Sequence, residues 1–358
     1  MWCDTVVSKR LGIKYPILQG PFGNGLSSIE LVAAVSNAGG LGSFGANSLS
    51  AEEITKIAGE IRLRTNKPFA INLWVAGSSE PALSKEQIDR MRLWFVPFYR
   101  ELGIRPPPLP KQFAHDYHSQ VEALIAAKPH VFSFALGVPS SEILSECRRR
   151  GIVTIGTASS VEEARALDER NVDAVVATGF EAGGDAGNFL HDSQDLLIGT
   201  LAFVPQVVDA VKVPVIAAGG IADERGLLAA LALGAQGVQI GTAFLASNES
   251  AVPEAHRHKL LTDEARRTVL SRVLSGRLMR AIPNRLMTEL ASRAGNPPYP
   301  IQKWLVDTLR SAAVAQGRSD LLPLAAGQAA PLVRPRSAAA LMAQLVDQTP
   351  RLLARLSR

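Results

Sequence analysis

The chain contains few cysteines and few aromatic residues, and both scarcities exclude classes of protein. Its two cysteines, Cys3 and Cys147, lie far apart and in no spacing typical of a metal site. A disulfide framework and a zinc site are therefore not expected, and a reducing cytoplasm is the compartment we expect. Aromatic residues make up only 6% of the chain, too few to interleave with basic residues along a nucleic-acid-binding face.

The basic residues behind the net charge of +5 are not gathered into a stripe, and the chain has no long apolar run. The arginines at 148–150 are accompanied by Glu142 and Glu146, as on a solvated helix face, so we expect no nucleic-acid partner. No segment has the roughly 18 unbroken apolar residues of a membrane span, and residues 1–4 do not begin a leader pattern. We therefore expect a soluble protein that is not exported and has no membrane partner.

Short apolar runs of strand length alternate with longer amphipathic stretches along the 358 residues. Such alternation is typical of repeated βα units with a parallel sheet. Eight strands are predicted, at residues 15–19, 41–44, 69–74, 131–135, 152–155, 174–178, 213–217 and 237–240. Helix signals at 28–38, 50–65 and 160–169 fall between them. The fold class we predict is α/β, a (β/α)₈ TIM barrel, with an open doubly wound sheet as the alternative.

The strand rhythm is interrupted twice, which defines the predicted domain organisation. Residues 76–120 form a long excursion after the third strand, which is either a lid or wall of a substrate pocket or a surface loop. After residue 245 the alternation of strand and helix signals ends, and prolines divide residues 246–325 into several predicted helices. We predict a barrel at 1–245, a helical insertion at 246–325, and a return at 326–358 that supplies the closing helix.

Two glycine-rich turns follow the seventh and eighth predicted strands. They contain Gly219 and Gly220, and then Gly241 and Thr242. Glycine lets the backbone approach a phosphate closely, and exposed amides at such turns donate to its oxygens. Tight strand exits also use glycine for conformational reasons alone, but two such turns on adjacent strands favour a phosphate site.

A third glycine cluster, residues 179–187, follows the sixth predicted strand and contains Glu181 and Asp185. It is either a structural turn with a capping carboxylate or a cofactor edge with a catalytic group. Asn72, at the end of the third predicted strand, has a polar side chain suited to hydrogen-bond the edge of a flavin ring.

Several other polar residues have both a structural and a functional interpretation. His115 and His118 lack a partnered carboxylate motif, so no metal site is expected. His191 is either an exposed loop histidine or a substitute for a catalytic base. Tyr299 either has a packing role or contacts the substrate pocket. Arg277, Arg280 and Arg285 either steer an anionic substrate or lie on a solvated face.

The ordered set of motifs resembles the nitronate monooxygenase family, formerly called 2-nitropropane dioxygenases, which includes flavin enoyl reductases and quinone reductases. The resemblance covers nearly the whole chain. It rests on residues 18–22, 38–42, 72–73, 181–187, 219–223, 241–242 and 326–328.

The resemblance implies FMN as the cofactor, with its phosphate on the two late glycine turns and its ring over the turn after the first strand. The implied cofactor-binding residues are Gly20, Pro21, Phe22, Asn72, Ala182, Gly183, Gly184, Gly219, Gly220, Gly241 and Thr242. Family members usually carry a catalytic histidine where this chain has Asp185, and a lysine or similar polar contact where it has residues 157–159. Histidine titrates near neutrality, whereas an aspartate is normally ionised and is a weaker base.

The predicted function is FMN-dependent oxidation of an alkyl nitronate by molecular oxygen, with Asp185 as the candidate catalytic residue. An anionic nitronate needs no proton abstraction, so Asp185 need not act as a strong base. The alternatives are an NAD(P)H-dependent flavin enoyl or quinone reductase, a phosphate-binding barrel isomerase or lyase without flavin, and a flavin-binding protein without turnover. A homodimer is one alternative for the oligomeric state, which we leave open.

Overall fold

Eight parallel strands form a closed barrel in a computed structural model that describes residues 2–75, 83–190, 197–293 and 295–357. Their order is β1-β9-β8-β6-β5-β4-β3-β2. A parallel bridge between Leu18 and Leu41 joins the first and last strands of this order, which closes the sheet. The barrel strands are β1 Ile17–Gln19, β2 Gly42–Gly45, β3 Phe69–Trp74, β4 Val131–Ala135, β5 Val153–Ala158, β6 Ala174–Thr178, β8 Val215–Ala218 and β9 Gly237–Ile240. The predicted TIM barrel is confirmed, and each predicted strand overlaps an observed one.

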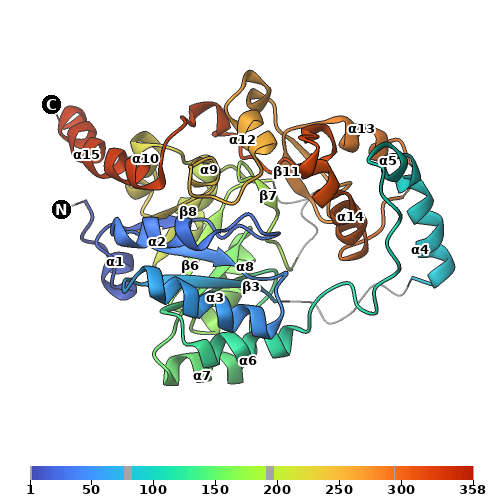
Figure 1. The fold of residues 1–358 in the computed structure, drawn as a ribbon. Helices are drawn as coiled ribbons and strands as arrows, with labels where there is room; N and C mark the ends of the chain where they lie inside the picture. The colour runs from blue at the N-terminus through green and yellow to red at the C-terminus, as the bar shows by residue number, and fades with distance from the viewer. Residues whose placement is uncertain (1, 76–82, 191–196, 294, 358) are drawn as a thin grey trace.

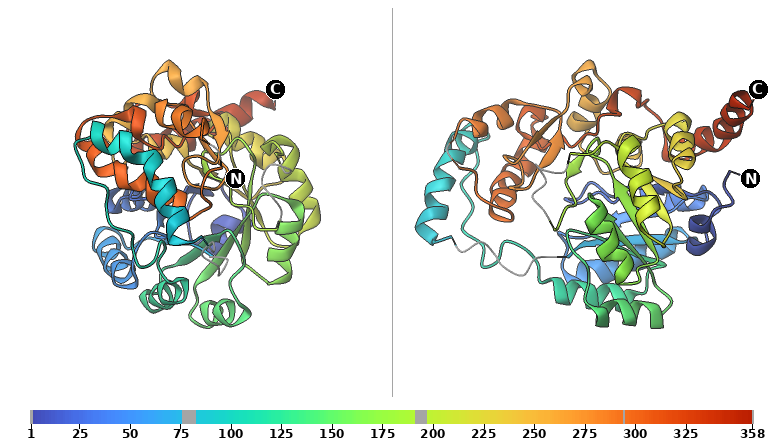
Figure 2. Two further views of the ribbon diagram at one scale, coloured as in Figure 1. Left: turned by 90° about the vertical axis from the view of Figure 1, so that its right-hand side faces the viewer. Right: turned by 180° about the vertical axis from the view of Figure 1, so that it is seen from behind.

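A ring of helices covers the outside of the barrel (Figure 2, left). The helices are α2 Ile29–Asn37, α3 Ala51–Arg64, α6 Tyr117–Ala127, α7 Ser141–Arg149, α8 Val161–Glu169, α9 Thr200–Ala210, α10 Glu224–Ala232 and α15 Ala338–Leu356. Serine side chains accept from the third helical amide of several of them, for example Ser50 and Ser160, which satisfies an otherwise unpaired donor. Helix α15 lies against α10 and α2 and so takes the place of the eighth helix.

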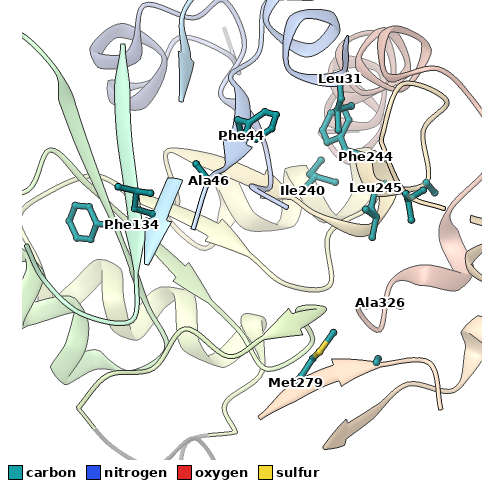
Figure 3. Close-up of a cluster of buried hydrophobic side chains, with 14 of the residues drawn as sticks. Leu31, Phe44, Ala46, Phe134, Ile240, Phe244, Leu245, Met279 and Ala326 are labelled. Carbon is teal, nitrogen blue, oxygen red and sulfur yellow. The ribbon is translucent and has the colours of Figure 1, made fainter. Parts of the chain in front are cut away.

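Apolar side chains form two buried layers, one inside the barrel and one between the strands and helices. The inner layer includes Leu18, Ile155 and Ile216, and α1 (Val6–Leu11) closes its amino-terminal end with Val7 and Leu11. The outer layer continues from Phe44 and Ile240 to Met279 and Ala326 of the later chain (Figure 3). The carboxyl ends of the strands, at the end opposite α1, are thus left for polar residues. None of the helices in the described part of the chain has the length and apolar content to cross a membrane.

Residues 246–325 contain more than the expected helices, because a β-hairpin lies among them. Its strands, β10 (Val269–Ser271) and β11 (Met279–Ala281), pair antiparallel, and β11 also pairs with β7 (Gly184–Asp185) from the loop after β6. The helices of this stretch are α12 Glu254–Leu260, η2 Asp263–Arg266, α13 Arg285–Ala291, α14 Ile301–Ala315 and η3 Ser319–Leu321, while α11 Thr242–Leu245 precedes it and η4 Ala330–Leu332 follows it. The domain boundaries at 245 and 325 stay a prediction.

The excursion after β3 packs against this later segment beyond the carboxyl ends of the strands. Its described helices, α4 (Lys85–Arg92), η1 (Leu93–Phe95) and α5 (Val96–Glu101), lie at the side of the molecule occupied by α13 and α14 (Figure 1). Tyr99 Oη bonds Thr308 Oγ1 at 2.8 Å, and the Glu101 carboxylate pairs with Arg285 and Arg318 at 2.6 and 2.5 Å. The described part of the excursion, residues 83–120, therefore forms a structured cover together with α13 and α14 and is not an isolated surface loop.

Glu101 makes the stability of this cover depend on pH. Hydrogen bonds from Arg285 and then Arg318 lower the pKa of Glu101 from 4.5 to about 2. Its stabilising contribution is therefore fully present above pH 4.5 and is lost as the pH falls towards 2. We expect Glu101→Gln to flatten the fall in the free energy of unfolding over this range, measured by urea unfolding at a series of pH values. Glu60→Gln, whose carboxylate lies 3.9 Å from Lys56 on exposed α3, is the control, and an equal change there would contradict the prediction.

Candidate active site

Polar side chains point into the barrel at the carboxyl ends of its strands. Asn72 is the register partner of Gly45 and Ser133, and its Nδ2 donates to Ser133 Oγ at 3.0 Å. Thr178 is the partner of Ala218, which belongs to the inner layer, so Thr178 faces inward too. The Thr178 Oγ1 atom is buried and has no hydrogen-bond partner within the described residues. Such an atom normally finds a partner, so a bound polar group is expected there.

The turn after β8 brings the backbone close to the loop after β6. Gly219 and Gly220 have φ angles of +97° and +71°, which side chains rarely adopt. A Cβ on Gly219 would lie 2.8 Å from the Gly179 carbonyl oxygen, so a side chain there would push the two loops apart.

The turn after β9 has open space in front of it. Gly241 has an ordinary φ of −93°, and a Cβ placed on it would meet nothing within 4 Å. Neither its φ nor a clash of an added Cβ with protein atoms therefore accounts for glycine at this position. Next to it, Thr242 Oγ1 accepts from the Gly327 amide at 2.9 Å, which leaves the hydroxyl proton free to donate outward.

The turn after β1 lies beside this position. A Cβ on Gly20 would come within 3.2 Å of the Gly241 Cα, so the two backbones abut. Phe22 forms a parallel bridge with Phe44, which fixes the chain beyond Pro21. The predicted residues Gly20, Gly241 and Thr242 are thus brought together, with Phe22 held over the neighbouring strand.

The loop after β6 is held on several sides. The Glu181 carboxylate accepts hydrogen bonds from Thr200 N and Oγ1, each at 2.9 Å. The backbone carbonyl of Glu181 accepts another from Gln328 N at 2.9 Å. A Cβ on Gly183 would lie 2.5 Å from the Gly327 nitrogen. Residues 327 and 328 therefore tie this loop to Thr242. Glu181, one of the two ionisable groups noted in the sequence, is a structural carboxylate here.

Asp185 lies on β7, and its carboxylate accepts a hydrogen bond from the turn between β10 and β11. Ser275 Oγ donates to Asp185 Oδ1, and β7 places Asp185 opposite Met279 of β11. Burial raises the pKa of Asp185, and the Ser275 bond and the nearby Arg277 charge oppose that rise. Burial, and then the Asp185 charge, raises the pKa of Tyr299 to about 12. The pKa of the Asp185 carboxyl group thus lies above its usual range, and the Tyr299 phenol, which is near enough to sense its charge, stays neutral.

Two cavities adjoin these residues. One of about 50 Å³ is lined by Thr178, Ala182, Gly184 and Asp185, with Leu270 and Leu278 as apolar walls. This cavity brings three of the predicted residues, Ala182, Gly184 and Asp185, together with Thr178. A larger one of about 490 Å³ lies beyond Tyr299, between the excursion and α14, and its lining includes Asn47, Phe113, Tyr299 and Lys303.

The structure separates the roles of the three arginines. Arg277 lies near Asp185, donates to the Asn188 carbonyl at 3.1 Å, and has its guanidinium carbon 5.9 Å from the Tyr299 ring centre. Arg280 is buried, and Arg285 belongs to the cover. Only Arg277 thus lies beside the candidate catalytic group.

Of the other polar residues considered in the sequence, His115 lines the larger cavity. His118 bonds Glu122 on the exposed face of α6, and the described part of the chain contains no cluster of histidine, cysteine and carboxylate side chains able to hold a metal. His191 lies outside the described residues.

Sequence reasoning missed Thr178 and Ser275. Thr178 is the last residue of a predicted strand, where inward polar side chains gather in a barrel. Ser275 precedes Gly276 between two short apolar runs, a turn signal that indicates the β10–β11 hairpin. Its partnership with Asp185, 90 residues away, has no signal in the sequence.

Comparison with known proteins identifies the family. Residues 4–348 match the family model described as nitronate monooxygenase. A probable nitronate monooxygenase from Staphylococcus aureus (strain Newman) is 37% identical over 97% of this chain and 98% of its own. A nitroalkane oxidase from Streptomyces ansochromogenes superposes with a TM-score of 0.89 at 33% identity, covering 98% of this chain and 99% of the other. FabK from Thermotoga maritima gives 0.78 at 28% identity, with 99% and 98% covered. The chain therefore belongs to the nitronate monooxygenase family and is an oxidoreductase.

Proposed function

We propose that the protein is an FMN-dependent oxidoreductase that oxidises alkyl nitronates with molecular oxygen. The observation that carries the cofactor proposal is the presence of open space and a buried polar atom without a partner at one end of the barrel. Gly184 and Gly241 both face space in which a Cβ would meet no atom within 4 Å. The buried Thr178 hydroxyl lacks a partner among the described residues. These residues fit a phosphate at the turns and a planar ring at the barrel mouth.

The residues that would hold FMN fall into two groups. The backbone of Gly219, Gly220 and Gly241, with the Thr242 hydroxyl, would bind the phosphate. Gly20, Pro21, Phe22, Asn72 and Ala182–Gly184 would line the ring, with Thr178 as an addition to the predicted set. The cofactor supplies the redox chemistry, and the protein supplies binding, orientation and electrostatics.

The chain's own residues favour an anionic substrate. The Arg277 guanidinium lies near Asp185 and supplies positive charge at the site. Because burial raises the pKa of Asp185, a larger fraction of its carboxyl group is neutral than in water. A neutral carboxyl does not repel a nitronate and is able to donate a hydrogen bond to it, while Ser275 fixes its orientation. Leu270 and Leu278 give the same cavity an apolar wall.

The test follows the visible spectrum of the purified protein under anaerobic additions. We expect a yellow protein whose flavin absorption bleaches on adding a nitronate and returns on adding oxygen. Bleaching by NADH or NADPH but not by nitronate would instead support the enoyl or quinone reductase, and no bleaching by any donor would support a flavin-binding protein without turnover. A colourless protein that gains no colour with FMN would contradict the cofactor proposal. Membership of an oxidoreductase family already counts against an isomerase or lyase.

A further inference from the structure

Arg280 is a buried cation that no part of the proposed chemistry uses. It lies on β11, and only 3% of its surface is exposed. Its Nε donates to the Phe180 carbonyl at 2.9 Å and its Nη1 to Thr268 Oγ1 at 3.2 Å. The guanidinium carbon lies 5.3 Å from the centre of the Phe180 ring.

The charge of Arg280 lacks a carboxylate partner at ion-pair distance within the described residues. Burial lowers its pKa, and the nearby Glu181 charge opposes that shift. The Glu181 carboxylate, however, is bonded to the Thr200 amide and hydroxyl. Burying a guanidinium without a carboxylate partner is costly, so the hydrogen bonds to Phe180 and Thr268 and the contact with the Phe180 ring are what offset that cost.

Arg280 contacts the loop after β6 at two points. Its side chain bonds the carbonyl of Phe180, and its backbone is the register partner of Gly184 in the β11–β7 ladder. Residues 181–183 lie between these two points. One residue of β11 thus fixes both ends of the segment that carries Ala182 and Gly183.

We propose that Arg280 is a positioning residue that holds residues 180–184 in the conformation that lines the cofactor. The proposal rests on the proposed function for the identity of that cofactor. The fixed loop also carries Asp185, directly after Gly184, so the same contact places the candidate catalytic carboxyl group opposite Ser275.

Three substitutions at this position separate the hydrogen bond from the charge. Arg280→Met has the same chain length as far as Nε but no donor, whereas Arg280→Gln places an amide nitrogen where Nε stands. Arg280→Lys keeps the charge. Arg285→Met is the control, because it removes ion pairs to Glu101, Glu289 and Asp320 in the same part of the chain without touching the loop.

Two measurements are made on each variant. Hydrogen exchange of the amides of residues 182–186 is followed in FMN-free protein, and the dissociation constant for FMN is obtained from quenching of its fluorescence. We expect Arg280→Met to speed exchange and weaken FMN binding, each by about tenfold or more, because a hydrogen bond from a charged donor is lost. We expect Arg280→Gln to restore both to within about threefold of wild type, and Arg285→Met to leave both unchanged.

Two results would overturn the proposal. The first is unchanged exchange in Arg280→Met. The second is an Arg280→Gln variant as impaired as Arg280→Met while Arg280→Lys is normal, which would assign the role to charge and not to the bond with Phe180. If the wild-type protein binds no FMN, the proposed function fails, and the exchange rates of residues 182–186 alone decide the role of Arg280.

Discussion

Gly241→Ala is expected to weaken FMN binding by about a hundredfold while leaving the ligand-free protein close to wild type in stability. The φ of Gly241 is one that alanine adopts freely, and the added Cβ would meet no protein atom within 4 Å. The methyl group would instead occupy the space in which we place the phosphate. The dissociation constant for FMN and the urea unfolding of the FMN-free protein are the two measurements.

Two control variants frame this result. Gly59→Ala, in exposed α3, also adds a Cβ in open space, and we expect it to stabilise the protein by roughly 0.5–1 kcal/mol without affecting FMN. Gly219→Ala is expected to destabilise the ligand-free protein as well, because of its positive φ and the nearby Gly179 carbonyl. Unchanged FMN affinity in Gly241→Ala would place the phosphate elsewhere.

Asp185→His is expected to raise the turnover of a neutral nitroalkane by about a hundredfold, at the lower end of what a positioned general base contributes. Histidine titrates near neutrality and is a stronger base than aspartate. Ser275 remains beside the new imidazole. Nitronate turnover is expected to stay within about threefold of wild type, because no proton is removed from that substrate. Steady-state kinetics with a nitroalkane and its preformed nitronate give both numbers.

Asp185→Asn is the matched control for the acid–base role. An amide keeps the size of the side chain and a hydrogen-bond donor but cannot act as a base. We therefore expect nitroalkane turnover to fall and nitronate turnover to persist. An equal loss with both substrates, or equal rates with both in the wild-type protein, would show that the preference for nitronate is wrong.

The barrel was predictable because its signals are local. Each strand is a short apolar run, and its alternating residues fill either the inner or the outer layer, as Leu18 and Ile17 do. The β10–β11 hairpin was missed because three-residue strands carry little periodicity and prolines nearby favoured helices. The pairing of β11 with β7 joins Asp185 and Met279 across more than 90 residues, a contact that no local pattern encodes.

The sequence by itself determined the barrel and the order of its glycine turns. Glycines 219 and 241 were predicted to lie near each other, because a parallel barrel brings the turns after successive strands to one end. Only the tertiary structure decided what surrounds them. It brought Ser275 within hydrogen-bond distance of Asp185 and left the Thr178 hydroxyl without a partner among the described residues. It also gave Arg277, Arg280 and Arg285 three different environments. Hydrogen bonds and burial depend on distances between segments far apart in the chain, and those distances are fixed only when the chain folds.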